Sequence, residues 1–198
     1  MRLRLDARKH KNQNEKVKSG KIGFLKLIQS LNGKTPEIHP SAWVHPSAVI
    51  IGDVHLAARV NIWPHVTIRA DEGSVYIGED TNIQDGTTIH MTGGLSNVLI
   101  GERVTVGHNC ILHGCTIEDD ILIGMGSLIM DNAVVHSGAF VGAATLVTGN
   151  KVVPPHTYVM GNPMRVVRPT GDREKTWIAY AWSHYVENAQ RYQKESEQ

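Results

Sequence analysis

Aliphatic residues recur along this chain at a spacing of six positions. Three short runs are followed by an unbroken run of eight: Ile50, Leu56, Ile62 and Ile68; Ile77, Ile83 and Ile89; Ile100, Val106 and Leu112; then Ile117, Ile123, Ile129, Val135, Val141, Val147, Val153 and Val159. A period of six fits neither a helix nor the alternation of a single strand. It is typical of a parallel β-helix in which three hexads make one triangular coil.

The eighteen readable hexads predict about six coils. Each aliphatic residue should point inward and stack on its counterpart one coil away. Small residues such as Cys110 and Ala133 fill the corner position of many hexads, where interior space is tight. A Gly often follows the aliphatic residue and relieves backbone crowding beside the corner. The two cysteines are therefore interpreted as reduced packing residues.

The pattern divides the chain into three parts. Residues 1–35 form a basic arm, predicted as a disordered tail followed by a short amphipathic helix from Ile22 to Leu31. Residues 36–168 form the β-helix. Residues 169–198 contain a helix packed along it, capped by Thr170 or Asp172, with one apolar face made by Ile178, Ala181, Trp182, Tyr185 and Ala189.

Charge and composition exclude several classes of protein. Residues 1–34 hold ten Lys and Arg against two acids, a net of +8, which leaves −7 on the rest and +1 overall. That balance gives no reason to expect nucleic-acid binding. Two Cys cannot build a disulfide framework, and no apolar run is long enough to span a membrane. A cytoplasmic location is expected.

Three histidines carry the candidate chemistry. His90 follows inward Ile89, and His113 follows inward Leu112, which is the third hexad later and therefore one coil away. Two imidazoles stacked at about 4.8 Å can chelate one metal ion. His108 follows Val106 and belongs to the preceding face, so it can complete the site only from another copy, in a cyclic trimer.

A competing metal motif is the run from His108 to Cys115, which reads H-x-C-x₂-H-x-C. Its spacing lacks the long stretch that separates ligand pairs in structural zinc sites. Three His with an open fourth position would instead make a catalytic site. Polar residues lie beside the histidines in the two coils concerned: Arg69, Asp71, Glu72, Asn82, Gln84 and Asp85.

These motifs together resemble the γ-class carbonic anhydrase family, over about residues 37–190. The resemblance rests on the stretches Ile68–Gly73 and Thr81–Gly86, on the three His motifs, and on Gly161–Pro163 leading into the last helix. It implies a left-handed β-helix, a homotrimer, and a zinc site, with ferrous iron or cobalt(II) as alternatives, made by His90 and His113 of one subunit and His108 of its neighbour. The implied reaction is reversible hydration of CO₂ to bicarbonate by metal-bound hydroxide.

The resemblance also implies roles for the polar residues. Arg69 and Asp71 would form an ion pair at the subunit interface. Gln84 would hold the nucleophile by a hydrogen bond, with Asp85 as its positioning partner.

Two further roles come from the same resemblance. Asn82 would support the site, and Glu72 would help to move protons.

This chain departs from the founding members of that family in two places. The loop from Met91 to Asn97 has no acidic residue to shuttle protons, and Val186 stands where an Asn is expected on the last helix. Slow turnover is therefore expected. Two alternatives stay open: a hexapeptide acyltransferase or CoA-thioester hydrolase, which needs no metal, and a non-catalytic trimeric scaffold stabilised by metal.

Overall fold

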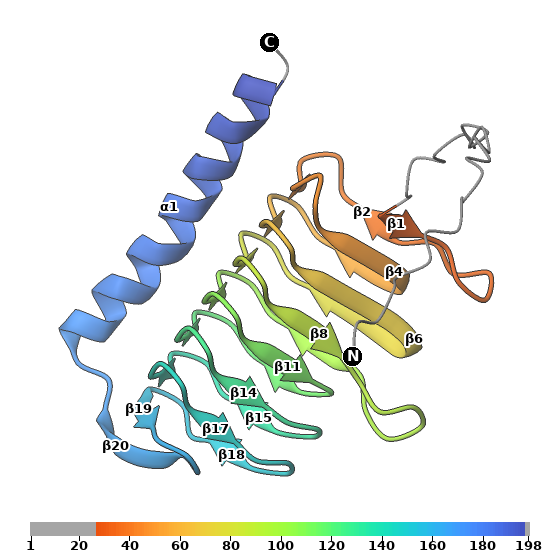
Figure 1. Cartoon of the computed structure of the whole chain (residues 1–198). Coiled ribbons are helices and arrows are strands. Elements are labelled where there is room, and N and C mark those ends of the chain that lie inside the picture. The colour runs from red at the N-terminus through yellow and green to blue at the C-terminus, as the bar shows by residue number, and fades with distance from the viewer. Residues whose placement is uncertain (1–26, 197–198) are drawn as a thin grey trace, which may run out of the picture.

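The computed structural model describes residues 27–196, which form a parallel β-solenoid of about seven turns with one C-terminal helix (Figure 1). One sheet holds twelve strands: β1 Ile28–Gln29, β2 Glu37–Ile38, β4 Val49–Leu56, β6 Thr67–Ile77, β8 Thr88–His90, β9 Val98–Ile100, β11 Ile111–His113, β12 Thr116–Ile117, β14 Leu128–Ile129, β15 Val134–Val135, β17 Leu146–Val147 and β18 Val152–Val153. The other holds eight: β3 Trp43–Val44, β5 Asn61–Ile62, β7 Asn82–Ile83, β10 Thr105–Val106, β13 Leu122–Ile123, β16 Phe140–Val141, β19 Thr157–Met160 and β20 Arg165–Pro169.

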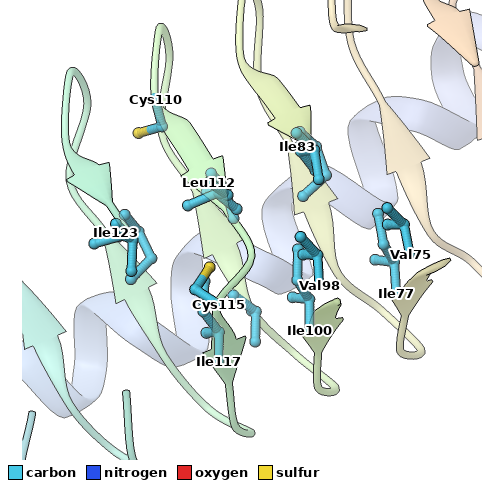
Figure 2. Packing of buried hydrophobic residues seen from close by; sticks show 14 of the residues in the cluster. Val75, Ile77, Ile83, Val98, Ile100, Cys110, Leu112, Cys115, Ile117 and Ile123 are labelled. Carbon is cyan, nitrogen blue, oxygen red and sulfur yellow. The ribbon is translucent and has the colours of Figure 1, made fainter. Parts of the chain in front are cut away.

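The hexad register is confirmed. All eighteen repeating aliphatic residues are buried in one continuous core, most of them completely. Each lies opposite its counterpart in the next coil; for example, Ile89 pairs with Leu112 and Leu112 with Ile129. Figure 2 shows these side chains stacked inside the prism, with Cys110 and Cys115 among them. The solenoid begins earlier than the first readable hexad, at Glu37–Ile38 and Trp43–Val44, whose residues pair in parallel with the next coil and add to the expected six turns.

The helix α1, Asp172–Ser196, packs on strands β3, β5, β7, β10 and β13 of the eight-stranded sheet, as expected. Its cap differs from the prediction. The first helical hydrogen bond joins the Lys175 N–H to the Gly171 carbonyl, and the Glu174 carboxylate accepts the Gly171 N–H at 2.8 Å. The same carboxylate is bonded by Arg168 at 2.8 and 2.9 Å. A Glu in the first turn therefore replaces the expected Thr170 or Asp172 cap.

The helix expected from Ile22 to Leu31 is wrong where the structure describes it. Ile28 and Gln29 form strand β1, paired in parallel with Ile50 and Ile51 of β4. The open edge of the first coil offers backbone partners to this segment, and pairing along that edge replaces the helical pattern. Residues 1–26, which hold most of the basic arm, lie outside the described residues. Within residues 27–196 no helix is long and apolar enough to cross a membrane.

Gly52 tests how closely the coils approach one another. Its φ is +84°, and a Cβ built there would lie 2.1 Å from the carbonyl oxygen of Ala70 in the next coil. We expect Gly52→Ala to lower the free energy of unfolding by about 1–3 kcal/mol more than Gly126→Ala does. Gly126 is the matched control because its φ is +71° with no atom near the added Cβ. Chemical unfolding followed by circular dichroism measures both, and equal losses would contradict the close approach.

Candidate metal centre

Two imidazoles face each other across neighbouring coils. Strands β8 and β11 pair in parallel, and His90 lies directly opposite His113 (Figure 1). The Nδ1 atom of His90 and the Nε2 atom of His113 are 3.2 Å apart. The two rings meet edge to face, with centroids 5.2 Å apart. The structure thus brings these two predicted ligands together, as the hexad register requires.

A carboxylate holds the outer nitrogen of each ring. His90 Nε2 lies 3.0 Å from Asp71 Oδ1, and His113 Nδ1 lies 2.9 Å from Asp131 Oδ2. A carboxylate only accepts hydrogen bonds, so the single N–H of each neutral ring is directed outward to its aspartate. With both protons placed outward, the inward nitrogens, His90 Nδ1 and His113 Nε2, each keep a lone pair and lie 3.2 Å apart.

The two aspartates stay ionised in this arrangement. Partial burial opposes ionisation of Asp71, but hydrogen bonds from His90 and Arg69 outweigh it and lower the pKa of Asp71 below its ordinary value. Burial likewise opposes ionisation of Asp131, and hydrogen bonds from Ser96 and His113 lower its pKa. Ionised carboxylates raise the basicity of the imidazoles that they orient.

The geometry of the pair suits a metal ion. Two nitrogen ligands of a tetrahedral ion with bonds of about 2.0–2.1 Å lie about 3.3 Å from each other. The two inward nitrogens here are 3.2 Å apart. Imidazole nitrogens suit zinc, iron and other divalent transition metals. One chain supplies too few ligands, because within residues 27–196 no group of three or more His, Cys, Asp or Glu could hold a metal ion.

His108 does not join the pair. It follows β10 in the other sheet, and its Nδ1 lies 3.0 Å from Asp85 Oδ2. The same reasoning applies to this ring. Its N–H is directed to the Asp85 carboxylate, so its Nε2 keeps a lone pair that can bind a metal ion. The side chain is 40% exposed, so it is presented at the surface of the single chain.

A buried chain of amides leads to Gln84. Asn82 donates to Thr105 Oγ1 at 2.9 Å, and Gln84 Nε2 donates to Asn82 Oδ1 at 3.1 Å. Asn82 is fully buried and Gln84 is 6% exposed. One N–H of the Gln84 amide is committed to Asn82, so Gln84 keeps its carbonyl oxygen as an acceptor for a ligand.

The remaining predicted residues lie in β6, where Arg69 is paired with Ile51 of β4 and Glu72 lies in the bulge that follows Ala70. Arg69 is bonded to Asp71 within the same chain. Glu72 accepts the Gly93 N–H at 2.9 Å and so holds the loop that follows β8. The interface role expected for Arg69 and the proton-transfer role expected for Glu72 are not tested by these contacts.

Asp131 is a site residue that the sequence reasoning missed. The hexad register alone does not reveal it, because Leu112 pairs with Ile129 and Asp131 therefore lies one position beyond the counterpart of His113. By contrast, the cysteines behave as predicted: both are free and buried, and desolvation raises the pKa of Cys110 to about 11 and of Cys115 to about 12. Protonated thiols are poor metal ligands.

The helix α1 brings aromatic residues over the eight-stranded sheet, which holds β7 and β10. Burial, and then the charge of Asp85, raise the pKa of Tyr185 above its ordinary value. Tyr180 stacks on His184 one turn away, with centroids 5.2 Å apart. Val186 lines a cavity of about 400 Å³ together with Trp43.

Comparison with known proteins agrees with this arrangement. Residues 35–70 match the family model of the bacterial transferase hexapeptide (six repeats). The chain is 36% identical over 176 residues to gamma carbonic anhydrase 1, mitochondrial, of Arabidopsis thaliana, covering 86% of this chain and 64% of that protein's length. It is 41% identical over 163 residues to protein YrdA of Escherichia coli, covering 79% of this chain and 89% of YrdA.

A solved structure resembles most of this chain. A hexapeptide transferase family protein from Anaplasma phagocytophilum superposes with a TM-score of 0.80 at 33% identity, covering 83% of this chain and 97% of that one.

The contact between Asp131 and His113 predicts a measurable effect on metal affinity. Replacing a carboxylate that orients a ligating His weakens metal binding by about 10–100-fold, so we expect Asp131→Asn to lower zinc affinity by that amount. The matched control is Glu118→Gln, because Glu118 Oε1 lies 2.8 Å from His136 Nδ1 in a similar pair with no second imidazole described beside it. Competition with a chromophoric chelator measures both, and equal affinities for the two variants would contradict the assignment.

Proposed function

Because this chain belongs to the γ-class carbonic anhydrase family of hexapeptide-repeat proteins, we propose that it hydrates CO₂ reversibly to bicarbonate. The observation that carries the proposal is the pair of inward imidazole nitrogens, 3.2 Å apart, with both outer nitrogens bonded to carboxylates. Two lone pairs aimed at one point repel each other unless a cation lies between them.

The complete site requires more than one copy of the chain. His90 and His113 of one subunit supply two ligands, and His108 of a neighbouring subunit supplies the third. A cyclic homotrimer creates this arrangement at each of its interfaces. Zinc is the proposed metal, with ferrous iron or cobalt(II) compatible with the same imidazole donors.

A metal ion held by three histidines supplies a Lewis acid that generates a nucleophile from water near neutral pH. The protein groups around it orient the reactants. Asn82 fixes the amide of Gln84, so the Gln84 carbonyl oxygen is the acceptor that can hold a nucleophile's proton and direct its lone pair toward CO₂. Asp85 accepts the N–H of His108 and fixes which nitrogen of that ring binds.

Proton release is the expected slow step. The loop from Met91 to Asn97 carries no acid, and Glu72 is bonded to the backbone of Gly93. A proton leaving the site therefore lacks a dedicated carboxylate on the loop, and turnover at low buffer concentration should be slow.

The direct test is stopped-flow CO₂ hydration by the zinc-loaded and iron-loaded protein. We expect His113→Ala to lose metal-dependent turnover, since one of the facing nitrogens is removed. The matched control is His136→Ala, which breaks a His–carboxylate pair on another rung and should retain activity. Equal rates in wild type and His113→Ala would remove the proposed mechanism.

The assembly has a separate test. We propose that Arg69 and Asp71 form an ion pair where subunits meet, so Arg69→Ala should shift the mass seen by light scattering toward monomer as the protein is diluted. Arg59→Ala is the control because Arg59 pairs with Glu79 and Asp80 at another corner. An unchanged mass for Arg69→Ala would count against the interface role.

A second candidate is acyl transfer or thioester hydrolysis with a CoA substrate, which the similarity to a hexapeptide transferase family protein favours. Such a reaction needs no metal, so turnover of a CoA ester that survives chelation would support it. Metal binding with a raised melting temperature and no turnover of either substrate would instead identify a scaffold. A cytoplasmic location stays a prediction.

A further inference from the structure

Both oxygens of the Asp131 carboxylate are engaged, and each has a different partner. Oδ2 accepts from His113 Nδ1 at 2.9 Å. Oδ1 accepts from the hydroxyl of Ser96 at 2.6 Å. The carboxylate is 19% exposed, so these bonds are partly shielded from water. A loop residue is therefore linked through one carboxylate to a ring of the proposed metal site.

The Ser96 hydroxyl has a defined direction. The Thr92 N–H donates to Ser96 Oγ at 3.4 Å, which uses the acceptor side of the hydroxyl. The hydroxyl proton is then directed to Asp131. The bond from Ser96 fixes the orientation of the carboxylate, in which Oδ2 faces His113 Nδ1.

The loop that carries Ser96 is held in place at both ends. Glu72 accepts the Gly93 N–H at 2.9 Å, and Asn97 Oδ1 accepts the Ser74 N–H at 2.9 Å. Met91, at the start of the loop, is fully buried. These contacts come from strand β6, so the position of Ser96 is fixed by the solenoid itself.

Gly114 leaves the space in which this contact forms. It directly follows His113, and a Cβ built on it would lie 2.0 Å from Ser96 Oγ and 2.3 Å from Asp131 Oδ1. Any other residue would push the hydroxyl and the carboxylate apart. The absent side chain is thus an independent observation that points to the same contact.

We propose that Ser96 is a positioning residue for the metal centre. Its hydroxyl locks the Asp131 carboxylate, the carboxylate locks His113 with its proton on Nδ1, and the lone pair of Nε2 is directed at the ion. The inference rests on the proposed metal site. It gives the acid-free loop a role in place of proton shuttling: the loop sets the affinity of the centre.

The chain contains a matched control for this device. Ser137 Oγ donates to Glu118 Oε2 at 3.0 Å, and Glu118 Oε1 lies 2.8 Å from His136 Nδ1. The order of serine, carboxylate and imidazole is the same, at a rung where no second imidazole is described opposite the ring. Ser137→Ala therefore removes a hydroxyl bond of the same kind away from the centre, while the Ser137 N–H still donates to Glu118 Oε2 at 2.9 Å.

Two measurements test the proposal. Zinc affinity, measured by chelator competition on the assembled protein, should fall about tenfold in Ser96→Ala and stay at the wild-type value in Ser137→Ala. Long-range ¹H–¹⁵N spectra of the metal-free protein report the ring tautomers. Ser96→Ala should give a mixed tautomer at His113 alone, and Ser137→Ala should leave the His113 tautomer unchanged. Melting temperatures of both variants show that the fold is retained.

The outcomes separate this inference from the proposed function. Wild-type zinc affinity in Ser96→Ala, or an unchanged His113 tautomer, would overturn the positioning role. An equal loss of affinity in Ser137→Ala would also overturn it, because the effect would then be general. Should the wild-type protein bind no zinc, the proposed function fails, and the tautomers of the metal-free protein alone decide the inference.

Discussion

The parallel pairing of one coil on the next is the constraint on which everything else in this protein depends. Buried aliphatic residues stack at the spacing of neighbouring strands, and any slip of one position would turn the core outward. That register also fixes the polar face, since a residue beside an inward aliphatic one must lie opposite its counterpart in the next coil. His90 and His113 face each other for this reason.

Histidine–carboxylate pairs recur along the solenoid, and most of them have no second imidazole described beside them. His55 lies between Glu37 and Asp53, and His136 is bonded to Glu118. Such pairs are explained as surface hydrogen bonds between adjacent rungs. The candidate metal centre differs because the neighbouring coil supplies a second ring directly opposite the first, so that two oriented nitrogens lie 3.2 Å apart. The convergence, and not the number of histidines, is what points to a metal.

The repeat made the solenoid, its core and the histidine pair predictable, because those features follow from spacing alone. Asp131 was not predictable in this way, because it lies one position beyond the residue that the register places opposite His113. The bond from Glu72 to the Gly93 N–H was not predictable either, since it depends on where an irregular loop folds back. The strand at Ile28 was missed because its partner is an open sheet edge and not a feature of its own sequence. The helix cap at Gly171 was missed because a carboxylate three residues later supplies the acceptor.

The loop after β8 is connected to the candidate metal centre through Asp131. The family resemblance implies an acidic residue in the corresponding loop of the founding members. Here the loop carries Ser96, whose hydroxyl donates to the Asp131 carboxylate beside His113. On the proposed function, this contact orients the metal site, while the loop offers no acid to carry protons away. Slow hydration with firm metal binding is therefore what the proposal predicts.

Subunit complementation tests the shared site most directly. His108→Ala and His113→Ala subunits are each inactive alone on this account, because each lacks one ligand at every interface. Unfolded together in equal amounts and reassembled at random, they should recover roughly one quarter of the wild-type CO₂ hydration, since each mixed trimer regains one intact interface of three. No recovery from verified mixed trimers, or full activity of His108→Ala alone, would contradict a metal ion shared between neighbouring copies.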